Sequence, residues 1–165
     1  MAYSFRPAVH EDLPLLRQWL QTPEVVRWWG DPEEQFALIR EDLSTQEMRQ
    51  WIISFEDRPF AYAQAYEVHR WPQPHFNDLP TGAMAIDAFI GEPSMIGCGH
   101  GGRFLRLLAE RLIDNGAPLV AIDPDVDNHR ARGAYRKAGF CGDTVVQTAE
   151  GSAVVMIFRR DSRAV

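Results

Sequence analysis

The spacing of apolar side chains predicts four helices. Apolar residues recur three and four positions apart in each, most clearly over residues 103–115, and so form one face of a helix. The expected helices cover residues 12–20, 32–43, 103–115 and 128–138. The last of them begins at a capping residue, Asp127 or Asn128, and ends where Gly139 follows it.

Seven shorter stretches have the composition of strands. They cover residues 4–7, 51–55, 59–67, 82–90, 119–122, 145–148 and 153–160. Turns at 56–58 and at Glu150-Gly151 join two pairs of them into hairpins. The stretch 119–122 is wholly apolar, as expected of a buried parallel strand. We therefore predict an α/β fold of the mixed α+β kind, with a single mixed, mostly antiparallel sheet and helices on both faces.

The composition is typical of one globular domain and disfavours nucleic acid and membranes as partners. The chain has 165 residues, of which 45% are hydrophobic, so a single domain over residues 1–165 can bury a core. The net charge of −6 disfavours nucleic acid as a partner and suits a cationic one, although solubility alone also accounts for it. No apolar run approaches the roughly 20 residues that span a bilayer, so no membrane partner is expected.

The cysteines and histidines predict a reducing compartment and no metal. Cys98 and Cys141 are the only cysteines, and the start of the chain lacks the pattern of a signal peptide, so we expect free thiols in a cytoplasmic protein. The five histidines show no ligand spacing, which predicts no metal site. Cys98 belongs to no triad pattern, which disfavours a nucleophilic role.

The glycine-rich run Ile96-Gly97-Cys98-Gly99-His100-Gly101-Gly102 precedes the predicted helix 103–115. Glycines let successive backbone N–H groups converge, and a helix N-terminus adds partial positive charge, so the run is a candidate site for phosphate oxygens. Its spacing and late position differ from the dinucleotide-binding G-x-G-x-x-G, and it lacks the G-K-[ST] of a P-loop. A flexible turn without a ligand is the remaining alternative.

Two blocks of the chain resemble the signatures of one acetyltransferase family. The run 96–101 resembles the acetyl-CoA pyrophosphate loop of the GNAT superfamily of N-acetyltransferases, [QR]-x-x-G-x-[GA], with Ile96 at the usually polar position. The block 128–140 is similar to the second signature, N-x-x-A-x-x-x-Y-x-x-x-G-F. The resemblance implies the GNAT fold, acetyl-CoA as co-substrate and direct acetyl transfer.

Within that superfamily the chain looks most like the aminoglycoside 6'-N-acetyltransferases. The segments that carry this likeness are 26–30 (VRWWG), 61–66 (AYAQAY), Ile86-Asp87, Asp123-Pro124 and Glu150-Gly151. Siderophore acyltransferases that act on hydroxylated lysine side chains are a second likeness, in segments 90–93 and 125–128. That group tends to carry His where this chain has Asp87, which favours the aminoglycoside likeness.

The resemblance implies a set of acetyl-CoA contacts. They are Ala88, Phe89, Ile96, Gly97, Cys98, Gly99, His100, Gly101, Gly102, Arg103, Asn128, Ala131 and Tyr135. Because Ile96 is apolar, the loop would hold the pyrophosphate mainly through backbone amides. A backbone N–H within residues 86–89 would bind the thioester carbonyl oxygen. For Asn128, a simple helix cap is an equally good alternative.

Asp87 and Tyr135 are the expected catalytic residues. Asp87 interrupts an otherwise apolar strand, where a carboxylate is costly unless paired, so we favour a functional role over a structural acid. By resemblance, Asp87 orients the acceptor amine and accepts its proton, directly or through water. By resemblance, Tyr135 is the general acid for the departing thiolate, with core packing as the alternative.

The expected acceptor contacts are Trp29, Glu67, Asp87, Asp123 and Glu150. The resemblance makes Trp29 an aromatic wall, with Trp28 the better core candidate. Asp123 would be a second cation anchor, with a structural turn at Asp123-Pro124 as a rival. Glu150 would contact a peripheral amine unless it is simply solvated. The proline-rich loop 69–80 departs from the aminoglycoside enzymes, which tend to be acidic there.

Together these features predict acetyl transfer from acetyl-CoA to a primary amine of a cationic small molecule, by resemblance the 6'-amine of an aminoglycoside. One alternative is a siderophore acyltransferase acting on a hydroxylated lysine or a related polyamine. A second is an acyl-CoA-binding sensor without catalysis. Neither nucleic acid nor membrane is an expected partner, and the chain would be a monomer or a homodimer.

Overall fold

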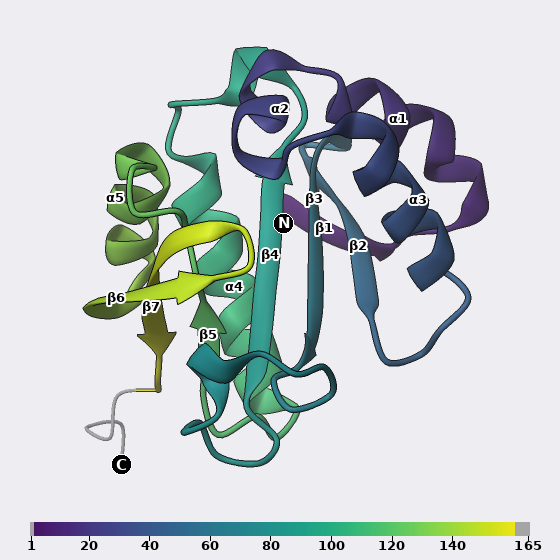
Figure 1. Ribbon diagram of the computed structural model, residues 1–165. Coiled ribbons are helices and arrows are strands. Elements are labelled where there is room, and N and C mark those ends of the chain that lie inside the picture. Colours follow the sequence, from purple (N-terminus) through teal and green to yellow (C-terminus); the bar gives the residue numbers. More distant parts are fainter. Residues whose placement is uncertain (1, 161–165) are drawn as a thin grey trace. The chain divides into compact units, whose positions relative to one another are not determined.

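The computed structural model describes residues 2–160 (Figure 1). The strands are β1 (Tyr3–Pro7), β2 (Arg49–Phe55), β3 (Arg58–Glu67), β4 (Met84–Ile90), β5 (Val120–Ile122), β6 (Cys141–Thr148) and β7 (Gly151–Phe158). The α-helices are α1 (Leu13–Leu20), α2 (Pro23–Trp29), α3 (Pro32–Asp42), α4 (His100–Asp114) and α5 (His129–Ala138). Three short 3-10 helices are η1 (His10–Asp12), η2 (Pro74–Phe76) and η3 (Pro93–Met95).

The strands form one mixed sheet in the order β1-β2-β3-β4-β5-β7-β6. Antiparallel pairing joins β1 to β2, β2 to β3, β5 to β7 and β6 to β7. The pairing of β4 with β5 is parallel, with Met84 opposite Val120. The predicted fold class is therefore confirmed in its central feature, a single mixed and mostly antiparallel sheet.

Close backbone contacts group the chain into two compact units. Unit 1 comprises the segment up to Ala65 together with Asp87–Cys98, and unit 2 comprises Tyr66–Ile86 together with the segment from Gly99 onward. Two of the unit boundaries fall inside β3 and β4, so each of these strands contributes residues to both units, and the third lies between Cys98 and Gly99.

In unit 1, α1, α2 and α3 pack against one another around a hydrophobic cluster (Figure 1). Its buried members are Leu16, Trp19, Leu20, Val25, Phe36, Ile39, Ile52, Tyr62 and Phe89. Complete burial of a side chain such as Leu16 contributes about 1.5–3 kcal/mol. The apolar spacing of α1 is thus explained by the strands that it covers within this unit.

A tight approach fixes the position of Gly91 in unit 1. A Cβ added to Gly91 would lie only 2.1 Å from the indole of Trp19. The indole N–H of Trp19 donates to Glu92 Oε1 at 3.1 Å, and the Gly91 N–H donates to the carbonyl of Phe60 at 2.8 Å. Glycine at position 91 therefore allows α1 to contact the chain directly after β4.

Asp12 and Gln50 are the buried polar residues among those described. The guanidinium of Arg6 donates to both carboxylate oxygens of Asp12 at 2.8 Å, and the Val9 N–H donates to Oδ2 at 2.9 Å. The hydrogen bond from Arg6 is the main reason that the pKa of Asp12 is lowered, while burial acts in the opposite direction. This pair connects β1 to the start of α1.

In unit 2, α4 and α5 lie side by side (Figure 1). The buried face of α4 consists of Phe104, Leu105, Leu108, Ala109 and Leu112. Gly102 lies at the contact between the two helices, because a Cβ there would be 2.9 Å from the carbonyl oxygen of Ala134. Asn128 caps α5, its Oδ1 accepting a hydrogen bond from the Ala131 N–H at 3.2 Å, and Gly139 ends the helix at φ 109°.

Most predicted elements are confirmed, but one helix was not predicted and the starts of two elements differ by three or four residues. Helix α2 was not predicted, although Pro23 at its first position is a helix-start signal. Helix α4 begins at His100 rather than at residue 103, so that the last glycines of the run form its first turn. Strand β6 begins at Cys141, four residues before the prediction, because it pairs with β7 across an irregularity. Between residues 2 and 160, no helix is long and apolar enough to cross a bilayer.

Candidate active site

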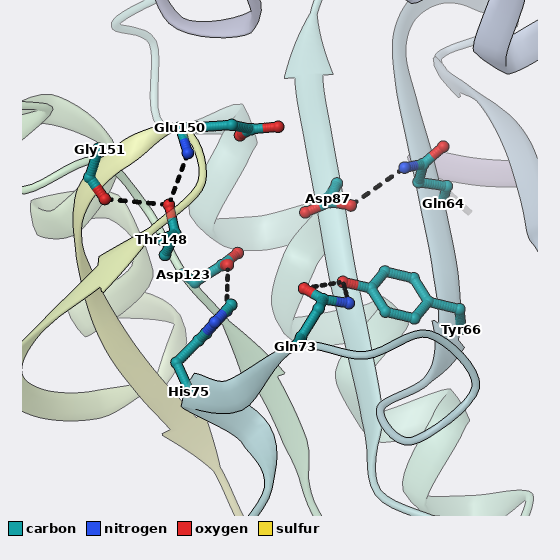
Figure 2. Close-up of polar contacts among 9 residues, drawn as sticks. All are labelled: Gln64, Tyr66, Gln73, His75, Asp87, Asp123, Thr148, Glu150 and Gly151. Carbon is teal, nitrogen blue, oxygen red and sulfur yellow. Dashed lines mark hydrogen bonds and ion pairs between the residues drawn. The ribbon is translucent and has the colours of Figure 1, made fainter.

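Asp87 lies half-buried on β4, in the part of that strand that belongs to unit 1. The side-chain amide of Gln64, on β3, donates to it with 3.0 Å between Nε2 and Oδ2 (Figure 2). This partner is a neutral amide, which orients the carboxylate and adds no charge of its own.

A chain of hydrogen bonds fixes the direction of the Gln64 amide. The buried Gln50 amide donates to the carbonyl of Ile39 at 3.2 Å and to the Tyr62 hydroxyl at 2.9 Å. The Tyr62 hydroxyl donates to Gln64 Oε1 at 2.8 Å. Burial raises the pKa of Tyr62, so its proton is retained and the hydroxyl acts as a donor. Gln64 must therefore direct its NH₂ group toward Asp87.

Trp29 packs against the aromatic residues next to this network. Its ring contacts Phe89 edge-on at a centroid distance of 5.0 Å and Tyr62 at 6.3 Å, and Tyr62 stacks on Phe89 at 5.2 Å. Trp28 instead lies half-buried under the Arg27 guanidinium, and its N–H donates to Glu24 at 3.2 Å. The expectation that Trp28 is the core residue of the pair is therefore wrong, since Trp29 packs on the core. The wall role of Trp29 stays a prediction.

The cofactor contacts expected on β4 have different surroundings. Ala88 is half-buried, whereas the Phe89 side chain is buried in the aromatic group of unit 1. Any contact of Phe89 with acetyl-CoA would therefore use its backbone. Ile96, half-buried, follows η3 in an extended conformation, so that it leads the chain into the glycine run.

The glycines of the run serve different physical purposes. Gly97 and Gly99 have φ of 76° and 85°, a region that disfavours other residues, and a Cβ at either would meet nothing within 4 Å. Gly102 instead allows the close packing of α4 on α5. Cys98 is exposed, as are Gly99 and Arg103, whereas His100 and Gly101 in the first turn of α4 are half-buried. The partial positive charge at the N-terminus of α4 suits an anion.

Tyr135 lies on α5, in unit 2, two turns after the cap at Asn128. Its half-buried ring is 6.3 Å from that of Phe140. The structure thus shows the capping role proposed for Asn128 and a packing contact for Tyr135. The roles of Asn128, Ala131 and Tyr135 toward acetyl-CoA stay predictions.

Asp123 follows β5 and has a partner that the sequence did not predict. The imidazole of His75, on η2, lies with Nε2 2.9 Å from Asp123 Oδ2 (Figure 2). Both residues belong to unit 2. The Pro124 carbonyl accepts a hydrogen bond from the Val154 N–H at 2.9 Å, which joins this segment to β7, and residues 123–124 themselves form no turn. The cation-anchor role of Asp123 stays a prediction.

The two glutamates of the expected acceptor set are placed differently. Both carboxylate oxygens of Glu67 accept backbone hydrogen bonds, from His69 at 3.0 Å and from Gly82 at 3.1 Å. Glu67 thus holds the two ends of the loop that follows β3, and its contact with an acceptor stays a prediction. Glu150 is exposed at the turn between β6 and β7, where its backbone N–H donates to Thr148 Oγ1 at 3.2 Å. Within residues 2–160, no three His, Cys, Asp or Glu side chains gather as a metal site would require.

A family model described as "Acetyltransferase (GNAT) domain" matches residues 8–148. The chain belongs to the GNAT acetyltransferases. Two further comparisons with curated relatives agree. An aminoglycoside N(6')-acetyltransferase type 1 of Klebsiella pneumoniae is 29% identical over 96% of this chain and 84% of that protein. A kanamycin resistance protein of Rhizobium radiobacter is 35% identical over 49% of this chain and 76% of that protein.

Solved structures place the same GNAT fold over nearly the whole chain. The enzyme AAC(6')-Ib in complex with paromomycin and acetyl-CoA has a TM-score of 0.88 at 26% identity, covering 99% of both chains. The same enzyme with coenzyme A and kanamycin has a TM-score of 0.84 at 28% identity, covering 96% of this chain and 95% of that one. The predicted membership of the superfamily is therefore confirmed.

Four side chains of the two polar networks in this GNAT chain were not predicted from its sequence: Gln50, Tyr62, Gln64 and His75. Gln50 and Tyr62 lie inside apolar strands, where a polar group has to find a partner, and that feature alone could have marked them. His75 lies in the loop without periodicity, where no spacing rule places a side chain against Asp123. Its neighbour in space is 48 positions away in the chain.

Proposed function

We propose that this GNAT chain transfers the acetyl group of acetyl-CoA directly to a primary amine of an aminoglycoside, at the 6' position. The similarity to enzymes named for this reaction supports the proposal, as does its extent along the chain. The net charge of −6 suits a polycationic acceptor. The single observation that carries the proposal is the Asp87 carboxylate, placed in an apolar strand and bonded to a neutral amide.

Acetyl-CoA supplies an acetyl group activated as a thioester. The glycine run fits its pyrophosphate, because Gly97 and Gly99 combine positive φ with open space and α4 begins at His100. Ile96 offers no polar side chain, so backbone N–H groups would provide the binding. Asn128 and Ala131, at the start of α5, are assigned to the pantetheine arm by resemblance to the family.

Asp87 is assigned to the acceptor. Its negative charge binds the substrate ammonium, and Gln64 holds the carboxylate in one orientation. Deprotonation of the ammonium by Asp87, directly or through water, gives the neutral amine that attacks the thioester. Tyr135, by resemblance, donates its hydroxyl proton to the departing sulfur. Trp29, Glu67, Asp123 and Glu150 complete the proposed acceptor set.

A competition assay tests the proposal. Purified protein is incubated with acetyl-CoA and one of three acceptors: kanamycin, N6-hydroxylysine or spermidine, and thiol release is followed over time. The proposal predicts a kcat/KM for kanamycin at least about tenfold above the other two, about 1.4 kcal/mol of discrimination. A preference for hydroxylysine would favour the siderophore alternative. Binding of CoA without turnover of any amine would favour the sensor.

A further inference from the structure

Several hydrogen bonds hold the loop from residue 69 to residue 80, here called the proline loop, in place. The Tyr66 hydroxyl and the Gln73 amide exchange hydrogen bonds of 3.2 and 3.0 Å (Figure 2). His69 Nε2 lies 2.7 Å from the Leu79 carbonyl oxygen. Glu67 accepts hydrogen bonds from the backbone N–H groups of His69, at the start of the loop, and of Gly82, two residues beyond its end. A loop fixed at this many points presents its side chains in defined positions.

Helix η2 places His75 against Asp123. The side chain of Phe76 is completely buried and anchors η2. The side chain of the preceding residue, His75, is buried as well. The His75 side chain is only 7% exposed, whereas that of Asp123 is 21% exposed. Of the two groups, the carboxylate is therefore the one that a ligand can reach.

The geometry of the pair determines what Asp123 offers to a ligand. Because an ionised carboxylate only accepts hydrogen bonds, the His75 Nε2–H donates to Oδ2 across 2.9 Å. This bond restricts the rotation of the carboxylate and directs Oδ1 away from the imidazole. A charge-assisted bond from an ammonium to a carboxylate held in this way loses little side-chain entropy.

We propose that His75 is a positioning residue that determines acceptor specificity: it orients Asp123 so that the carboxylate binds an ammonium of the acceptor other than the amine that reacts. This inference rests on the proposed function. It also accounts for the proline loop, whose composition departs from the acidic pattern expected of such enzymes. In this chain, one carboxylate oriented by an imidazole takes the place of additional acidic side chains.

Steady-state kinetics with five variants test the inference. His75→Phe removes the donor and keeps a ring, His75→Gln keeps a donor, Asp123→Asn removes the charge, and the double variant combines His75→Phe with Asp123→Asn. His69→Phe loosens the proline loop without touching Asp123 and is the matched control. For each variant, kcat, the acceptor KM and the acetyl-CoA KM are measured with kanamycin and with 6-amino-6-deoxyglucose, which has only the reacting amine. Calorimetry gives the Kd for kanamycin in the presence of CoA, and a thermal melt confirms folding.

We expect His75→Phe to raise the kanamycin KM and Kd by about three- to tenfold, with kcat and the acetyl-CoA KM within about twofold. His75→Gln and His69→Phe should remain within about twofold of wild type for kanamycin. His75→Phe should have no further effect in the Asp123→Asn background and no effect on kcat/KM for the monoamine.

An effect of His75→Phe that persists in the Asp123→Asn background would overturn the inference, as would an equal effect on the monoamine or an equal effect of His69→Phe. An unchanged kanamycin KM in a folded His75→Phe protein would overturn it as well. If His75→Phe does not fold, His75→Gln and Asp123→Asn still test it, because the two would then have to differ in kanamycin Kd. Failure of the wild-type protein to bind or acetylate kanamycin would instead overturn the proposed function, and this inference with it.

Discussion

The Gln64 amide donates to the Asp87 carboxylate, with 3.0 Å between Nε2 and Oδ2. This bond connects neighbouring strands of the sheet, and its direction is imposed by the Tyr62 hydroxyl behind it. A neutral donor brings no charge of its own and gives the acid a fixed orientation. The proposed chemistry of Asp87 requires both properties.

Replacing Gln64 with Leu should reduce the kcat/KM for the amine acceptor by about tenfold, or about 1.4 kcal/mol. The physical reason is that Asp87 loses a donor that orients it, while the charge remains. The Kd for acetyl-CoA, measured by calorimetry, should stay within about twofold. A loss of acetyl-CoA affinity as large as the loss in kcat/KM would contradict the account.

Tyr62→Phe should act mainly on stability. The Tyr62 side chain is completely buried and its hydroxyl connects Gln50 to Gln64, so its removal leaves the buried Gln50 and the half-buried Gln64 each short of a bond, at a cost of about 1–3 kcal/mol. Urea unfolding measures this. Tyr66→Phe is the matched control on the same strand; Gln73 is only half-buried, so a smaller loss is expected. Equal losses in the free energy of unfolding for the two variants would contradict the stabilising role of the network around Tyr62.

Replacing either of two glycines of the glycine run with alanine should have different effects. Gly102→Ala places a Cβ 2.9 Å from a backbone oxygen of α5, so a loss of about 1–3 kcal/mol in the free energy of unfolding is expected. In Gly97→Ala the new Cβ has no atom within 4 Å, but the residue must keep φ 76°. For alanine this conformation costs about 1 kcal/mol, so the backbone that would bind pyrophosphate is altered. The CoA Kd should therefore rise more for Gly97→Ala. The reverse order would contradict the assignment.

The Arg6–Asp12 pair predicts a dependence of stability on pH. The pKa of Asp12 is lower in the folded chain than in the unfolded one, chiefly through the hydrogen bond from Arg6. Its contribution is thus complete above the unfolded pKa of about 3.9 and is lost as the pH falls from there through the folded pKa. Asp12→Asn should be less stable than wild type by about 1–2 kcal/mol near pH 7, since Arg6 is half-exposed. In urea titrations this gap should shrink below about pH 4; a constant gap would contradict the prediction.

The sequence predicted most of the fold because local signals and packing agree. The glycine at 139 and the cap at Asn128 define α5, and the helical spacing of α4 coincides with its buried face. Helix α2 was missed because its seven residues are too few for a periodic pattern. The first turn of α4 was missed because glycines disfavour helices, and here close packing on α5 compensates.

The candidate site was predicted less completely. The sequence alone shows that Asp87 is the one charged residue in an otherwise apolar strand. Its link through Gln64 to Tyr62 and Gln50 required knowledge of which strands pair and in which register. His75 could not be inferred, because its contact with Asp123 depends on how an irregular loop folds onto a distant strand end.

Product analysis of kanamycin tests the central claim most directly. Wild-type protein and Asp87→Asn, which keeps the shape of the side chain, are incubated with acetyl-CoA and kanamycin, and the product is examined by mass spectrometry and NMR. The account predicts a product heavier by one acetyl group at the 6'-amine, and a kcat/KM at least about a hundredfold lower for Asp87→Asn with unchanged acetyl-CoA affinity. Absence of an acetylated product from the wild-type protein, or acetylation at another amine with full activity in Asp87→Asn, would contradict it.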